Sequence, residues 1–190
     1  MSVMSSELTR ARDPDGEHKT GAARFDERTA ACVAVAWLVL INKPLYPLTV
    51  WVLIGGEAAT RSLAALAIAP LYAAVLWLAP RSGYGARVAL PLVGVADTVI
   101  AAKAFGAGSG AELYLIACGA LAIVSFPARE AMTSRALVIV VYAAFVLLQI
   151  RLGAPVEVWP PADLARFFAL NAYSAASLAA FVGLRFATAE

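Results

Sequence analysis

Residues Ser62–Pro80 read SLAALAIAPLYAAVLWLAP, a run of nineteen residues without a charged side chain. The hydrocarbon core of a bilayer is about 30 Å thick, and an α-helix crosses it in about 20 residues. The run is therefore long enough to cross a membrane as a single helix.

The whole chain shares this character. Of its 190 residues, 62% are hydrophobic and only 15% are charged, and the mean hydropathy is +0.77. A soluble domain carries about 25% charged residues. Because the apolar residues come in long runs, the composition predicts an all-α, polytopic transmembrane bundle whose first partner is the lipid bilayer.

Five further segments extend the pattern to six expected helices. We expect spans at about 30–54, 62–80, 86–105, 111–128, 132–153 and 164–186, within a transmembrane domain covering 29–186. The first span is irregular, because Lys43 interrupts it and Pro44 and Pro47 follow. We interpret it as one kinked span, and the alternative is a re-entrant or interfacial break at NKPLYP.

The first 28 residues are polar and charged, with Pro14 and Gly16 as helix breakers, which predicts a disordered tail. With this tail in the cytoplasm, lysines and arginines divide ten to four between the two sides, and Lys43 lies within the membrane. The positive-inside rule then predicts that both termini are cytoplasmic. The inner residues are Arg10, Arg12, Lys19, Arg24, Arg28, Arg81, Arg87, Arg129, Arg135 and Arg185, and the outer ones are Arg61, Lys103, Arg151 and Arg166.

Several function classes lack their sequence signals. His18 is the one histidine and lies in the polar tail, and Cys32 and Cys118 lie inside apolar runs, where we expect them to pack as small hydrophobic residues. The net charge of +2 is too small to indicate nucleic-acid binding. We therefore expect no metal site, no cofactor, no nucleic-acid partner and no catalytic residues.

Two charges fall near the middles of expected spans: Lys43 in the first and Asp97 in the third. Charged residues inside a bilayer are costly and are usually paired or functional. One hypothesis is a buried Lys43–Asp97 pair that fixes helix packing or senses a proton or ligand. The alternative is that Lys43 snorkels from a displaced helix while Asp97 faces a wet gap.

The stretch FGAGSGAELYLIACGALAIVSFPARE, residues 105–130, places Glu112 in the first turn of the fourth expected span. A carboxylate there offsets the positive end of the helix, which is the simpler interpretation. The other is that Glu112 and Tyr114 form an outer rim that contacts a ligand.

The last expected span contains Ala172, Ala176 and Ala180 at four-residue spacing. Small residues at this spacing allow two helices to approach closely. Packing within the bundle is the default interpretation, and a homodimer seam is the alternative. Asn171 and Ser174 add polar groups that could hydrogen-bond between helices.

The segment GSGAELYLIACGALAIVSFPARE, which follows an apolar third span, is similar to the membrane-associated sensor domains of bacterial class III adenylate and guanylate cyclases. Such domains also precede some histidine kinases and diguanylate cyclases. The resemblance covers about 28–190 and includes the FPARE exit, the outer loop VEVWPPADL and the segment LRFATAE, whose last residues, 187–190, resemble the start of a cytoplasmic coupling helix. It implies a multi-pass protein of a bacterial inner membrane, a homodimer, and a cytoplasmic signalling domain in cis or in trans.

No cyclase, kinase or diguanylate cyclase domain lies within the 190 residues, so the resemblance carries no catalytic residue here. The chain is then either a piece of a longer receptor or a stand-alone relative. Our first hypothesis is a sensor or anchor domain that relays a signal through its last helix. The alternative is a small transporter or channel with a polar path through Lys43, Asp97 and Glu112.

Overall fold

The structure of the protein, a computed structural model, describes residues 26–151 and 158–187. Every regular element in these two ranges is helical. The elements are α1 (Glu27–Leu53), α2 (Gly56–Ser62), the 3₁₀ helix η1 (Leu63–Ile68), α3 (Ala69–Leu78), α4 (Gly83–Phe105), the 3₁₀ turns η2 (Ala107–Ser109) and η3 (Ala111–Leu113), α5 (Tyr114–Val124), the 3₁₀ turn η4 (Ala128–Glu130), α6 (Ala131–Arg151) and α7 (Pro161–Ala187).

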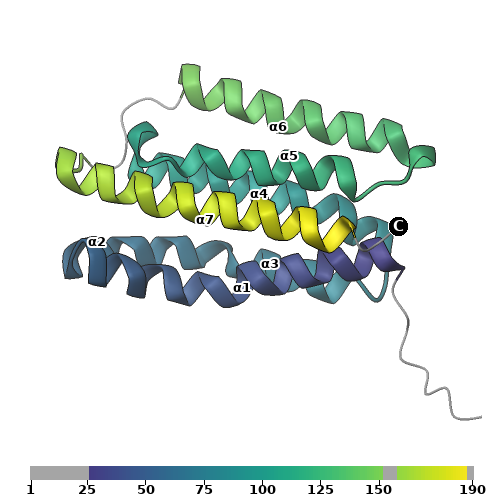
Figure 1. Cartoon of the computed structure of the whole chain (residues 1–190), viewed down its shortest axis with the longest axis horizontal. Helices are drawn as coiled ribbons and strands as arrows, with labels where there is room; N and C mark the ends of the chain where they lie inside the picture. Colours follow the sequence, from purple (N-terminus) through teal and green to yellow (C-terminus); the bar gives the residue numbers. More distant parts are fainter. Residues whose placement is uncertain (1–25, 152–157, 188–190) are drawn as a thin grey trace, which may run out of the picture.

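The helices lie side by side along one long axis (Figure 1). α6 forms one edge of the bundle and α1 with α2, η1 and α3 forms the other, while α4, α5 and α7 lie between them. α1 begins and α7 ends at the same end of the bundle, which we call the terminal end. The end that carries the turn between α4 and α5 is called the opposite end.

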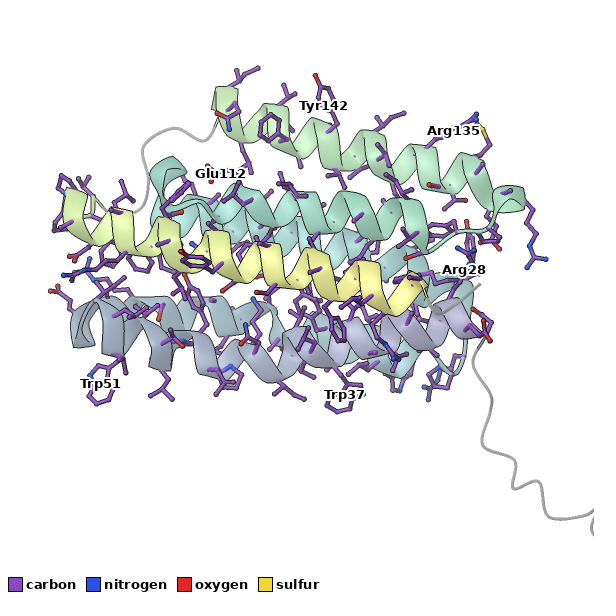
Figure 2. The ribbon with its side chains drawn as sticks, in the orientation of Figure 1. Arg28, Trp37, Trp51, Glu112, Arg135 and Tyr142 are labelled. Atoms are coloured by element: carbon purple, nitrogen blue, oxygen red, sulfur yellow. The ribbon has the colours of Figure 1, made fainter. Side chains whose placement is uncertain are left out.

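Five helices of the described chain are long and apolar enough to cross a membrane: Glu27–Leu53, Gly56–Leu78, Gly83–Phe105, Ala128–Ile150 and Pro161–Ala187. A sixth apolar helix, Ala111–Val124, is shorter. Large apolar side chains cover much of the outer surface. Trp37 and Trp51, for example, are 50% and 59% exposed and point away from the bundle (Figure 2). Such a surface suits contact with lipid.

The first helix shows how the sequence sets a long span. Asp26 caps it by accepting hydrogen bonds from the backbone N–H and the hydroxyl of Thr29, both at 2.8 Å. α1 then runs without interruption through Pro44 and Pro47 to Leu53. The structure therefore has one continuous helix here and no break at NKPLYP.

The other expected spans differ from the helices mainly at their ends. The second begins at Gly56 rather than 62, because Glu57 and Arg61 pair across one turn at 2.6 Å and stay within the helix. The fourth ends at Val124 rather than 128, because Pro127 adopts an extended backbone that α-helix cannot continue through. The expectations for 1–25, 152–153 and 188–190 lie outside the described residues.

The GAGSG segment makes the turn at the opposite end. Gly106 and Gly110 have positive φ angles of 88° and 72°, a conformation that L-residues rarely adopt. A Cβ atom on Gly110 would also lie 2.9 Å from the ring of Phe168 on α7. Glycine at position 110 thus lets the α4–α5 turn pack closely against α7.

Candidate functional site

Lys43 and Asp97 lie in contact inside the bundle. Lys43 Nζ is 2.6 Å from Asp97 Oδ1 and 2.7 Å from Oδ2. The hydroxyl of Tyr72, on α3, donates to Asp97 Oδ2 at 3.0 Å, and Lys43 Nζ lies 5.8 Å from the centre of the Tyr72 ring. One network of three side chains therefore joins α1, α3 and α4.

The side chains of this pair are largely withdrawn from the surface, with 11% of Lys43 and 18% of Asp97 exposed. A lone charge at the centre of a bilayer costs at least ~2.5 kcal/mol on insertion scales. Each charge neutralises the other here, and the Tyr72 hydroxyl adds a hydrogen bond to the carboxylate. Pairing makes the two charges tolerable at this depth.

A cavity of about 520 Å³ surrounds the pair. It lies at the mid-depth of the bundle, between α1, α4, α5 and α7, and η1 and α3 each add one residue to its wall. Its walls are mainly apolar, and no charged side chain other than Lys43 and Asp97 lines it among the described residues. Further polar groups in its wall come from Asn42, Tyr46, Thr98, Tyr114, Asn171, Tyr173, Ser174 and Ser177. Volume, apolar walls and a few convergent polar groups are the usual properties of a small-molecule site.

Aromatic rings close the bundle at the opposite end. The ring centres of Phe105 and Phe167 are 5.0 Å apart, and those of Trp159 and Phe167 are 4.9 Å apart. Tyr46 of α1 extends this cluster, with its ring centre 6.1 Å from that of Phe105. The cluster links α1, α4 and α7, and two of its members, Tyr46 and Phe105, also line the cavity.

Arginines hold the terminal end together. Arg28 donates to the carbonyl of Val124 at 2.6 Å, and Arg87 donates to that of Ser125 at 3.0 Å. Arg87 also binds the carboxylate of Glu130 at 2.8 Å. The last carbonyls of α5 therefore face two cations, the charge that the end of a helix dipole favours.

Asn171 ties the middle of α7 to its neighbours. Its amide nitrogen donates to the carbonyl of Ser109 at 2.9 Å, and its amide oxygen accepts from Tyr46 at 3.3 Å. Asn171 is 2% exposed. Asn171 thus makes the expected hydrogen bonds to neighbouring elements, one to the α4–α5 turn and one to α1.

The structure separates the two residues of the expected outer rim. Tyr114 lines the cavity, whereas Glu112 lies in η3 and does not. Glu112 Oε2 is buried without a hydrogen-bond partner among the described residues. The polar path suggested for a transporter, through Lys43, Asp97 and Glu112, therefore does not follow this cavity.

The small-residue stripe of α7 is turned away from the bundle. Ala176 and Ala180 are exposed and Ala172 is half-buried, whereas the neighbouring Ala175 is buried. The helix packs through the face that carries Asn171, Ala175 and Val182. Packing within the bundle, the default interpretation of the stripe, is thus not the role of Ala176 and Ala180.

Two parts of this arrangement were not expected. Tyr72 lies in an uncharged run, and nothing in that run distinguishes its buried hydroxyl from a lipid-facing one. Arg87 was counted only as an inner cation, although its position at the start of one helix and that of Glu130 before the next are a signal for pairing at one end of the bundle. Among the described residues, no three histidine, cysteine, aspartate or glutamate side chains gather as a metal site requires.

The comparisons with known proteins assign no family, because no protein-family model, curated protein or solved structure matches this chain. The geometry of the cavity is therefore the basis for any inference about function.

Proposed function

We propose that this chain is a membrane-embedded sensor module that binds a small molecule in the mid-bundle cavity and passes its occupancy on through α7. The observation that carries the proposal is the cavity around Lys43, Asp97 and Tyr72. α7 supplies one wall of it, including Ser174 and Phe181, and continues to Ala187 at the terminal end. A ligand that favours one packing of α7 over another would shift the population of its end positions.

The proposed module crosses a bacterial inner membrane six times, with both termini in the cytoplasm. The shorter helix α5 makes the fourth of these crossings. Support for an even number of crossings comes from Figure 1, where α1 begins and α7 ends at the same end of the bundle. Cations are also more frequent at that end, as the positive-inside rule requires of a cytoplasmic face. They are Arg28, Arg81, Arg87, Arg129, Arg135 and Arg185, against Arg61, Lys103, Arg151 and Arg166 at the opposite end.

The output of the module would be a cytoplasmic signalling domain, such as a nucleotide cyclase, in cis or in trans, and the module would act as a homodimer. Exposed Ala176 and Ala180 support the dimer, because small residues let two helices approach closely in lipid. Changing both to Leu should lower intersubunit crosslinking in native membranes. Crosslinking that stays at the level of the unchanged protein would exclude this seam.

A transporter or channel is the alternative function. Two observations weigh against it: aromatic rings pack against one another at the opposite end, and Glu112 does not line the cavity. We therefore give the sensor the preference.

The relay can be tested without knowing the ligand. Ser174→Phe would fill part of the cavity and so imitate an occupant. Spin labels at Glu27→Cys and Ala187→Cys would report the distance between the start of α1 and the end of α7. Both native cysteines are buried, so the labels would go to the introduced ones. Dilution with unlabelled protein restricts the measurement to one subunit.

We expect Ser174→Phe to shift the distance distribution between the two labels. Ala169→Phe is the matched control, since Ala169 is exposed on α7 and does not line the cavity. A distribution that stays the same in folded Ser174→Phe, checked by its thermal unfolding, would refute the relay.

A further inference from the structure

The exposed part of the cavity wall comes from two helices only. Leu38 and Asn42 of α1 and Tyr173 and Ser177 of α7 are exposed, whereas every other lining residue is buried or half-buried. We call these four residues the lateral mouth. An opening framed by α1 and α7 faces outward from the side of the bundle rather than toward either end.

The lateral mouth lies at the depth of the hydrocarbon core. All four residues are near the midpoints of their helices, which run from Glu27 to Leu53 and from Pro161 to Ala187. Toward the terminal end, α1 and α7 share a buried cluster that includes Val35 and Val182. Toward the opposite end, they share a second cluster that includes Val50 and Phe167. The opening between these two contacts therefore meets lipid tails and not water.

Both sides of the lateral mouth carry a polar side chain. Asn42 on α1 and Ser177 on α7 are exposed where the surroundings are apolar. Exposing an amide or a hydroxyl to hydrocarbon without a partner costs several kcal/mol on cyclohexane scales, roughly 4–8. A molecule with a polar head that passes between α1 and α7 would give both groups a hydrogen-bond partner.

The charges of the cavity indicate a neutral head. Lys43 and Asp97 neutralise each other, and no other charged side chain lines the cavity among the described residues. A charged ligand would bring an uncompensated charge into a low-dielectric site. Lys43 has three N–H donors and gives two to Asp97, so one remains for a carbonyl or hydroxyl oxygen.

The remaining wall suits an apolar body. Leu90, Leu121, Leu178 and Phe181 line the cavity, and its volume of about 520 Å³ lies within the range of sites for drug-sized molecules. Building on the sensor function proposed above, we propose that the ligand is a neutral, bilayer-dissolved amphiphile with a carbonyl or hydroxyl head, which enters from the membrane through the lateral mouth.

Photolabelling in lipid nanodiscs tests both the ligand class and the route. The probe is a long-chain alcohol with a diazirine in its chain, and the matched probe has the same chain with a trimethylammonium head. Mass spectrometry of the digested protein would measure labelling at buried lining residues of α5, such as Leu121. Excess unlabelled alcohol identifies saturable labelling.

We expect the alcohol to label α5 saturably and the cationic probe to label it at least tenfold less. Asn42→Trp and Ser177→Trp, which narrow the lateral mouth, should each lower labelling by the alcohol about tenfold. Ile41→Trp is the control, because Ile41 is 59% exposed on α1 but does not line the cavity, and it should leave labelling unchanged.

Equal labelling by the two probes would overturn the neutral head, and full labelling of both lateral-mouth variants would overturn the lateral route. Absence of saturable labelling at α5 would overturn the ligand class. The Ser174→Phe distance shift does not depend on any probe, so it separates these failures from failure of the relay.

Discussion

At the residue scale, the charge pair was one of two hypotheses, and its hydrogen-bonding partner was not foreseen. Lys43 and Asp97 each interrupt an apolar run, and a lone charge in a bilayer is costly. A pair relieves that cost, but so do a snorkelling Lys43 and a wet gap at Asp97, and the structure shows the pair. Tyr72 gives no such signal, because the uncharged run 62–80 does not show which of its faces lies against the other helices. Its hydrogen bond to Asp97 follows from the packing of α3 against α4, which the sequence of neither helix reveals.

Removal of one member of the Lys43–Asp97 pair should destabilise the protein. Lys43→Met leaves Asp97 unpaired and Asp97→Leu leaves Lys43 unpaired, and breaking a buried pair costs about 3–5 kcal/mol. The double variant should recover much of this loss because no charge then stays behind. Thermal unfolding of the four proteins in nanodiscs measures the coupling free energy. Single losses that simply add would show that the pair is not energetically coupled.

The cap of α1 should respond to pH. Burial raises the pKa of Asp26, but the hydrogen bonds from Thr29 and the charge of Arg87 lower it further, so the pKa lies below its ordinary value of 3.8. A lowered pKa in the folded state stabilises the protein at pH values above the unfolded pKa, and this contribution is lost as the pH falls through the folded value. Asp26→Asn keeps a capping oxygen without the charge.

The unchanged protein should therefore be more stable than Asp26→Asn at pH 6, and the difference in unfolding midpoint should shrink as the pH falls below about 4. Glu27→Gln is the control, since Glu27 is an exposed neighbour in the first turn of α1. A difference that stays constant between pH 6 and pH 3 would contradict the role of the Asp26 charge.

At the element scale, the cores of the helices were predictable and their ends were not. An apolar run stops at the first charge, but a helix continues wherever the charge is satisfied. Glu57 and Arg61 satisfy each other within α2, and Asp163 and Arg166 lie 3.4 Å apart in the first turns of α7. Both helices consequently begin before the apolar runs that predict them.

The helix α5 is shorter than the hydrocarbon core is thick, and neighbouring side chains bind the backbone at both of its ends. Together with η3 it has three plus eleven residues, which at 1.5 Å per residue span about 21 Å, less than the ~30 Å core. Non-helical backbone is tolerated at membrane depth where protein satisfies its polar groups. Asn171 binds the carbonyl of Ser109 before α5, and Arg28 and Arg87 bind carbonyls at its end.

We therefore expect Arg87 to contribute more to the stability of the protein than an exposed cation at the same end of the bundle. Arg87→Met removes the hydrogen bond to Ser125 and leaves the half-buried carboxylate of Glu130 with only the exposed Arg129, 3.9 Å away, so we expect a loss of about 3 kcal/mol. Hydrogen exchange should rise in the last turn of α5. Arg129→Met is the matched control: Arg129 is 84% exposed, and an exposed ion pair contributes ~0–1 kcal/mol. Equal effects of the two variants would contradict the capping role of Arg87.

At the scale of the whole molecule, hydropathy predicts a helical membrane protein but not its cavity. The cavity walls come from five α-helices and from η1, and which side of each helix faces the cavity depends on how the helices rotate against one another. The weak point of the sequence prediction is the number of crossings, since five helices have the length and composition to span and α5 falls short. α5 packs against α4, α6 and α7. These contacts hold it within the bundle although it is shorter than those five helices.

The number of crossings and their direction are open to a direct test. Reporter fusions after Gly16, Gly108 and Glu190 sample the polar tail, the α4–α5 turn and the last residue of the chain. We expect cytoplasmic signals at Gly16 and Glu190 and an extracytoplasmic signal at Gly108, because arginines concentrate at the terminal end and attract it to the cytoplasmic face. If α5 failed to cross, the segments on its two sides would emerge on the same face, and Glu190 would report the extracytoplasmic side. A signal of that kind would contradict six crossings, and inverted signals at all three positions would contradict the orientation alone.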